Sequence, residues 1–206
     1  MPITQSREYR DINALKAIES KDSTITTEPS YVVEGYAATF DSYPLYTDER
    51  GNTYSELIDR AAFNGTDTSD VIMQYDHAGM VMARTANNTL DLTVDDHGLK
   101  VRADLGSTAQ SRELYEAIAS GLITKMSFAF TVDDDDYDDD TNTRNIRHIK
   151  KLYDVSAVSY PANPGTEIGL SARDVIDGLI DGKKQERLKA EQAIKKLMLK
   201  IKIMEA

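Results

Sequence analysis

The chain has 206 residues, with 24 Lys and Arg against 35 Asp and Glu, a net charge of −11, and neither cysteine nor tryptophan. This length suits one domain with a buried core, and the lack of cysteine excludes disulfide scaffolds, thiol nucleophiles, zinc fingers and Cys-ligated clusters. Because His77, His97 and His148 are not at helical ligand spacing, we expect no metal site and no cofactor.

The charge is unevenly distributed along the chain. From Gly182 to the end, eight Lys and Arg stand against three Glu, which gives +5 on this tail and leaves −16 on the rest. An acidic body repels a phosphate backbone, so we expect no nucleic-acid partner. The N-terminus has no apolar signal region, and no stretch approaches the roughly 18 apolar residues of a membrane span. We therefore expect a soluble, intracellular protein with no membrane partner.

The chain divides into three parts. Residues 1–30 lack sustained periodicity and end in Ser, Thr and Pro, which predicts a flexible leader. The main domain is predicted at residues 31–173, and a basic helical tail at residues 174–206.

Strands are predicted in the main domain wherever β-prone runs or apolar and polar alternation occur. In chain order they are residues 31–40, 70–77, 90–94, 99–105, 122–132 and 150–160. A polar loop from Asp41 to Tyr54 and a short apolar segment at residues 55–63 separate the first two. The DDHG turn between the third and the fourth predicts a hairpin with one buried face.

A change of period after residue 106 predicts one helix of about three turns. Ser107 is the expected N-cap, with Gln110 three residues on, and Gly121 is expected just past the helix end. The combination of several strands with helices predicts an α+β fold whose mostly antiparallel sheet curls into a barrel or sandwich with flanking helices.

The tail from about Ser171 is also predicted to be helical. Its apolar residues follow the a/d rhythm of a coiled-coil seam over about two heptads: Ala190, Ile194, Leu197, Ile201 and Met204. We expect this helix to dock on a partner, and pairing with a second copy of the chain is one option.

An acidic run from Asp133 to Asp140 places seven carboxylates in eight residues. As a calcium loop it fails, because the sixth and twelfth positions would be Asp138 and Arg144 instead of Gly and Glu. We interpret the run as a solvated turn between two strands.

Ser127, His77 and Asp154 each lie at the polar face or the end of a predicted strand. They are the residue types of an acyl-transfer triad, in which an imidazole takes the proton of a serine and a third group orients the imidazole. Each also has an ordinary structural interpretation, and the pattern alone does not show that the three meet.

Six blocks of the sequence occur in a characteristic order. They are GYAATFD at 35–41, ELIDRAAF at 56–63, DVIMQYDH at 70–77, TLDLTVDDHGLKVRADL at 89–105, GLITKMSFAF at 121–130 and LYDVSAVSYPANPGTEI at 152–168. From about Tyr31 to Arg173 the chain thereby resembles the tailed-phage prohead proteases. These are serine peptidases of capsid maturation that are related in fold to herpesvirus assemblin.

The resemblance implies a role for each candidate. His77 ends the block before the hairpin and matches the general base of the family, Ser127 matches the nucleophile, and Asp154 matches the acidic third member. Two positions depart from the family pattern: the family has Asp after the histidine, whereas Asp76 precedes His77, and Asp154 stands where Glu is commoner. Assemblins use a second histidine as the third member, so His148 is the alternative there.

The same resemblance implies a serine endopeptidase that cleaves the phage major capsid protein precursor and scaffold, and also itself, inside the assembling prohead in the host cytoplasm. By position, backbone N–H groups of the PANPG loop and Arg173 are candidates for stabilising the oxyanion. A non-catalytic capsid assembly scaffold or chaperone of the same fold is the alternative. A membrane-surface role of the tail is disfavoured, because its apolar seam is narrow and lacks aromatic residues.

Overall fold

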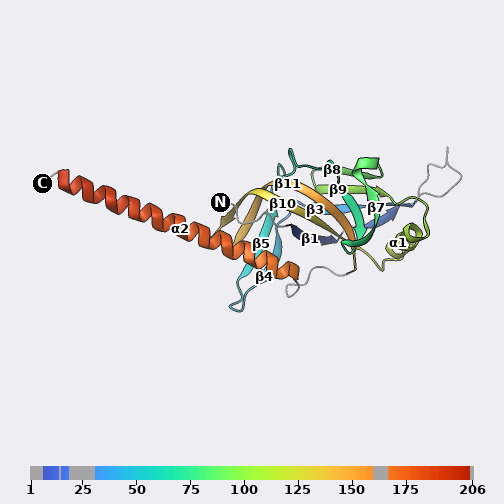
Figure 1. Ribbon diagram of the computed structural model, residues 1–206. Coiled ribbons are helices and arrows are strands. Elements are labelled where there is room, and N and C mark those ends of the chain that lie inside the picture. Colours follow the sequence, from blue (N-terminus) through green and yellow to red (C-terminus); the bar gives the residue numbers. More distant parts are fainter. Residues whose placement is uncertain (1–6, 14, 19–30, 160–166, 205–206) are drawn as a thin grey trace.

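The computed structural model describes residues 7–13, 15–18, 31–159 and 167–204. It contains two β-sheets of mostly antiparallel strands and two α-helices (Figure 1), so the predicted α+β class is confirmed. Neither sheet closes into a barrel, and the two sheets share one core instead. No helix in the described part of the chain is both long and apolar enough to span a membrane.

The larger sheet has seven strands and carries the candidate site. Its main path runs in the order β1 (Glu8–Asn13), β10 (Lys125–Asp138), β11 (Thr143–Val158), β5 (Thr53–Ile58) and β4 (Tyr43–Thr47). β6 (Ile72–Tyr75) pairs with the last part of β11, and β7 (Ala78–Arg84) pairs with β6. β5 and β6 run parallel to β11 along different stretches, and the other pairs are antiparallel.

The smaller sheet has four strands in the order β2 (Lys16–Ile18), β3 (Val32–Thr39), β9 (Gly98–Asp104) and β8 (Leu90–Val94). The predicted hairpin is confirmed, since β8 and β9 pair antiparallel. Its buried face is also confirmed, because the alternate residues Leu99, Val101 and Ala103 are all buried. These side chains belong to the same core as Phe128 and Leu152 of the larger sheet.

Helix α1 (Ala109–Ala119) lies where the change of period predicts it. Its N-cap is Thr108 instead of Ser107, since the Thr108 hydroxyl accepts the backbone N–H of Ser111 at 3.1 Å. Gly121 follows the helix with a φ of +77°, a left-handed conformation that favours glycine at a helix end. A short 3-10 helix, η1 (Thr85–Asn87), links β7 to β8.

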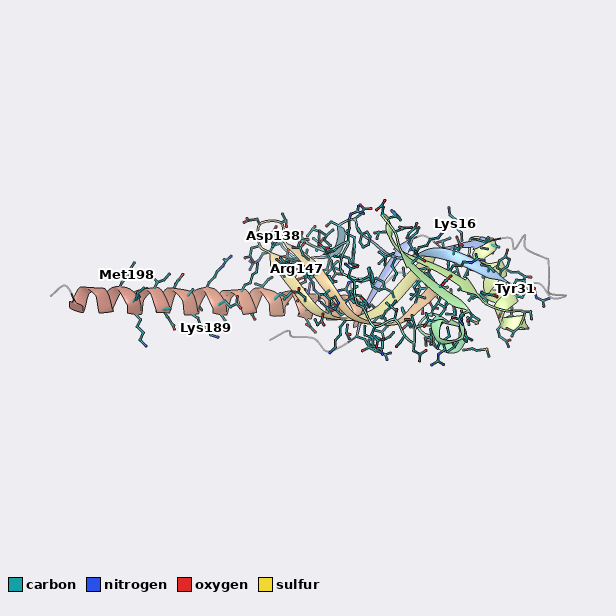
Figure 2. The ribbon with its side chains drawn as sticks, turned by 90° about the horizontal axis from the view of Figure 1, so that it is seen from above. Lys16, Tyr31, Asp138, Arg147, Lys189 and Met198 are labelled. Atoms are coloured by element: carbon teal, nitrogen blue, oxygen red, sulfur yellow. The ribbon has the colours of Figure 1, made fainter. Side chains whose placement is uncertain are left out.

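Helix α2 (Glu167–Met204) confirms that the end of the chain is helical. Near its start, Ile176 is buried in a small second core with Tyr46 and Tyr137. Further along, Lys183 and Arg187 contact the end of β10 and the turn after it. Beyond Arg187 the helix extends away from the sheets (Figure 1), and Figure 2 shows the side chains of Lys189 and Met198 on the extended part.

The acidic run differs from its predicted structure. Residues up to Asp138 belong to β10, and the turn is confined to residues 139–142, so the interpretation as a solvated turn is wrong for most of the run. The strand tolerates the carboxylates because basic side chains face several of them. The ion pairs are Asp135 with Arg144, Asp136 with Arg147, Asp133 with His148 and Asp139 with Arg187.

Three other segments also contain strands that the sequence pattern did not predict, and one of them holds β7, which follows the predicted strand at residues 70–77. β1 and β2 lie in the segment expected to be a flexible leader, and β1 adds an edge strand to the larger sheet. The expected polar loop from Asp41 to Tyr54 holds β4 and the start of β5. In that loop the rings of Tyr46 and Tyr54 stack with a centroid distance of 4.7 Å, so its aromatic residues support a hairpin.

Candidate active site

His77 lies in the two-residue turn that joins β6 to β7. Tyr75 and Ala78 are the paired residues on either side of the turn. Asp76 and His77 have φ angles of 48° and 55°, so both adopt the left-handed conformation that a tight hairpin turn requires. Left-handed backbone is uncommon for histidine, and such conformations concentrate at functional sites.

Asp76 fixes this turn to the end of β11. Its carboxylate accepts hydrogen bonds from the backbone N–H and the hydroxyl of Ser159, each at 2.8 Å. Its own backbone N–H donates to the carbonyl of Ala157 at 2.9 Å. The aspartate before the histidine, a departure from the family pattern, therefore has a structural role in holding His77 beside β11.

The imidazole of His77 contacts the carboxylate of Asp154. His77 Nδ1 lies 2.5 Å from Asp154 Oδ1, and the side chains are 17% and 7% exposed. A carboxylate oxygen only accepts hydrogen bonds, so Nδ1 carries the hydrogen and the lone pair of the neutral ring is on Nε2. The hydroxyl of Ser156 donates to the same Oδ1 atom at 2.9 Å, so Asp154 is held from two sides.

Ser127 lies on β10, one strand away from Asp154. Ser127 is opposite Ser156, and Ala129 is opposite Asp154. Because opposed residues share a face and alternate residues return to it, Ser127, Ser156 and Asp154 face the same side of the sheet. Ser127 is 0% exposed. Neither its Oγ nor His77 Nε2 has a hydrogen-bond partner among the described residues, so no hydrogen bond joins the two.

Tyr9 of β1 is a site residue that the sequence pattern missed. It is opposite Ala129 and thus on the same face of the sheet as Ser127. Its ring meets the His77 ring edge-on, with a centroid distance of 4.8 Å and an interplanar angle of 76°. No motif marked it, because it lies in the segment expected to be a flexible leader.

The alternative third member, His148, lies away from His77. Its ring nitrogens contact the carboxylate of Asp133 and, at 3.1 Å, the backbone carbonyl of Asn64. The hydrogen bond with Asp133 raises the pKa of His148 above its usual value. Of the two candidates for the third position, only Asp154 contacts the imidazole of His77.

Arg173 and His97 contact other parts of the described structure. Arg173 lies over the ring of Tyr46, 5.1 Å from its centroid, on helix α2. The PANPG loop lies outside the described residues. His97 is in the turn between β8 and β9, as expected, with its ring edge-on to Tyr36.

Beneath the site, on the opposite face of β1, lies a buried cluster of ionised side chains. Arg10 donates to Glu8 at 2.8 Å and to Glu56 at 2.6 and 2.8 Å. Arg144 also contacts both glutamates, at 2.9 Å from Glu56. All four side chains are at most 5% exposed. A buried charge is stable only when it is paired. Because the partners lie on three strands, these ion pairs hold β1 against β5 and β11.

The ionisation of Glu56 reflects this pairing. Burial alone raises the pKa of a carboxyl group, but the adjacent guanidinium groups of Arg10 and Arg144 outweigh it and lower the pKa of Glu56 to about 2. The hydroxyl of Tyr43 donates to the same carboxylate at 2.5 Å. Burial and the charge of Glu56 raise the pKa of Tyr43 well above its usual value.

The sequence model of the caudovirus prohead serine proteases matches residues 16–178, most of the chain. The chain belongs to this family. It is 28% identical over 152 residues to the prohead protease of Enterobacteria phage HK97, and the alignment covers 72% of this chain and 62% of that relative. The match therefore spans less than two thirds of that relative's length. No solved structure matches the chain.

Proposed function

We propose that this prohead protease family member is a serine endopeptidase in which His77, Ser127 and Asp154 form the catalytic triad. The observation that carries the proposal is the contact between His77 Nδ1 and Asp154 Oδ1 at 2.5 Å, on the same sheet face as Ser127. The contact leaves Nε2 as the basic atom, and acyl transfer by a serine needs a basic nitrogen to take the hydroxyl proton.

In the proposed reaction, His77 Nε2 takes the hydroxyl proton of Ser127 while Oγ attacks the carbonyl carbon of the scissile peptide bond. The imidazolium then gives the proton to the leaving amine, so an acyl-enzyme remains on Ser127. Water, deprotonated by His77, releases the acyl group and restores the serine. Asp154 holds the ring in the required tautomer and stabilises its charge, and Ser156 positions Asp154.

The proposed substrates are the phage major capsid protein precursor and scaffold, together with the enzyme itself, inside the assembling prohead in the host cytoplasm. Support comes from the family description and from the name of the HK97 relative, a prohead protease. The proposed relation to herpesvirus assemblin rests on the sequence blocks alone.

We propose that the extended part of α2 carries the enzyme to its partner in the shell. Leu188, Ile194, Leu197 and Met198 are large apolar residues that are at least 43% exposed there. Lysines surround them, so an amphipathic helix with acidic flanks would match both the seam and the charge. Deletion of residues 188–206, which spares the buried Ile176, should leave peptidase activity intact and abolish encapsidation. Unchanged encapsidation would contradict this role.

Co-expression with a capsid protein precursor tests the enzymatic proposal. We expect the wild-type chain to cleave the precursor and the Ser127→Ala variant to leave it intact while folding normally. Ser120→Ala, at the exposed end of α1, is the matched control and should cleave as the wild type does. Equal cleavage by Ser127→Ala and wild type would favour a non-catalytic assembly scaffold or chaperone of the same fold.

A further inference from the structure

The two atoms that must react are both shielded. Ser127 is fully buried, and Nε2 of His77 is buried without a hydrogen-bond partner among the described residues. Attack on a peptide bond requires the serine oxygen to come within about 3–3.5 Å of the carbonyl carbon. A polypeptide cannot approach a fully buried hydroxyl, so the described conformation is closed to substrate.

The element beside Ser127 on the outer side is β1. It pairs antiparallel with β10 from Glu8, opposite Phe130, to Asn13, opposite Lys125, and Asp11 is directly opposite Ser127. From the same strand, the ring of Tyr9 packs edge-on against the imidazole of His77. One strand therefore flanks the proposed nucleophile and covers the proposed base.

The buried cluster of charges anchors the first part of β1. Glu8 and Arg10 are held by the buried charges of Glu56 and Arg144. Residues 11–13, which run beside Ser127, come after this anchor in the chain. Departure of residues 11–13 from β10 would break ladder hydrogen bonds without separating the buried ion pairs, and local opening of an edge strand needs less free energy than unfolding.

We propose that β1 is a built-in block of the active site. In the closed state residues 11–13 occupy the edge of β10 beside Ser127, and substrate gains access to Ser127 only when these residues leave β10. Tyr9 lies between the anchored Glu8 and Arg10 and stays packed against the His77 ring. The inference rests on the proposed function, because it concerns regulation of the same site. It gives the N-terminal strand a role in keeping the enzyme latent.

A reversible cross-link between β1 and β10 tests the block. Asn13 and Lys125 are directly opposed, and opposed residues of antiparallel strands have Cα atoms about 4.5–5.5 Å apart, within disulfide range. Since the chain has no cysteine, the Asn13→Cys, Lys125→Cys double variant can form only this one disulfide within a chain. Each single variant is a matched control. Failure of the disulfide to form under oxidation would overturn the pairing on which the proposal depends.

The readout is the labelling rate of Ser127 by a fluorophosphonate probe. In this reaction the serine oxygen bonds to phosphorus, fluoride leaves, and the hydroxyl proton goes to His77. We expect the oxidised double variant to label at least about tenfold more slowly than its reduced form, because the cross-link removes the open fraction that reacts. Reductant should restore the rate, and the single variants should not respond to oxidant.

The outcomes separate the two proposals. Equal labelling of the oxidised and reduced double variant would show that β1 need not leave, and would overturn the block while leaving the peptidase proposal standing. If the folded wild-type chain neither labels at Ser127 nor cleaves a co-expressed capsid protein precursor, the peptidase proposal is overturned, and the block with it.

Discussion

His77 Nδ1 and Asp154 Oδ1 lie 2.5 Å apart although the two residues are 77 positions apart in the chain. The contact forms because β6 runs parallel to the last part of β11, with Ile72 opposite Asp154, and the β6–β7 turn then brings His77 back over that strand. The position of the imidazole therefore depends on this strand pairing, and the following predictions test its consequences.

Asp154→Asn should lower kcat about ten-thousand-fold while leaving the fold intact. The amide can donate a hydrogen to Nδ1, which favours the wrong tautomer of His77, and it does not stabilise the imidazolium. Steady-state cleavage of a capsid-derived peptide measures the effect. His148→Gln is the control and should cleave at the wild-type rate, since His148 contacts Asp133 and Asn64. A large loss of kcat in His148→Gln with none in Asp154→Asn would make His148 the third member of the triad.

Ser156→Ala should lower kcat by about 10- to 100-fold with little change in KM, because a hydrogen bond to a charged group is worth about 1.5–3 kcal/mol. The variant removes the donor 2.9 Å from Asp154 Oδ1 and leaves the groups that would contact substrate. Ser111→Ala is the matched control, since Ser111 is also buried and hydrogen-bonded but lies on α1. It should lower stability without lowering kcat. Equal kcat values for the two variants would contradict the role of Ser156 in positioning Asp154.

Arg144→Ala should lower the free energy of unfolding by about 3–5 kcal/mol, because it leaves Glu8 and Glu56 buried without one of their partners. Arg147→Ala is the control on the same strand. Its ion pair with Asp136 is exposed, so its loss should cost about 0–1 kcal/mol. Urea unfolding followed by circular dichroism measures both. Similar small losses would mean that the cluster does not anchor β1.

Glu56 should contribute to acid unfolding. Its pKa falls from about 4.5 in the unfolded chain to about 2 in the folded protein, so its contribution is fully present above pH 4.5 and is lost as the pH falls toward 2. The stability difference between wild type and Glu56→Gln should therefore shrink by up to about 3 kcal/mol over that interval, at 1.36 kcal/mol per pKa unit. Urea midpoints at a series of pH values measure it. A constant difference would contradict the pairing.

The local patterns predicted the β8–β9 hairpin and α1 because neighbouring residues determine those elements. Leu99, Val101 and Ala103 alternate along one strand, and Leu114 and Ile118 are one helical turn apart, so each buried face is visible within a short window. β1 was missed for the opposite reason. Its inner face carries Glu8 and Arg10, and charged residues become acceptable in a core only through partners far along the chain.

The site was only partly accessible from the sequence. Residue types alone left the convergence of His77, Ser127 and Asp154 open, and the family blocks were needed to single them out. Two features of the site had no sequence signal: the left-handed turn at Asp76 and His77, and the contact of Tyr9 with His77. An Asp-His pair is not a typical sequence for a tight hairpin turn, and a single tyrosine does not indicate which side chain it will pack against. Both depend on how β6 and β1 pair with their neighbours.

The most direct test of the proposed mechanism is to locate the adduct that a fluorophosphonate forms with the protein. Mass spectrometry of peptides from the treated wild-type chain should find the probe on Ser127, and the His77→Ala variant should carry almost none, because no base removes the hydroxyl proton. An adduct on Ser156, or equal labelling of Ser127 in the two proteins, would contradict the assignment of Ser127 as nucleophile and His77 as its base.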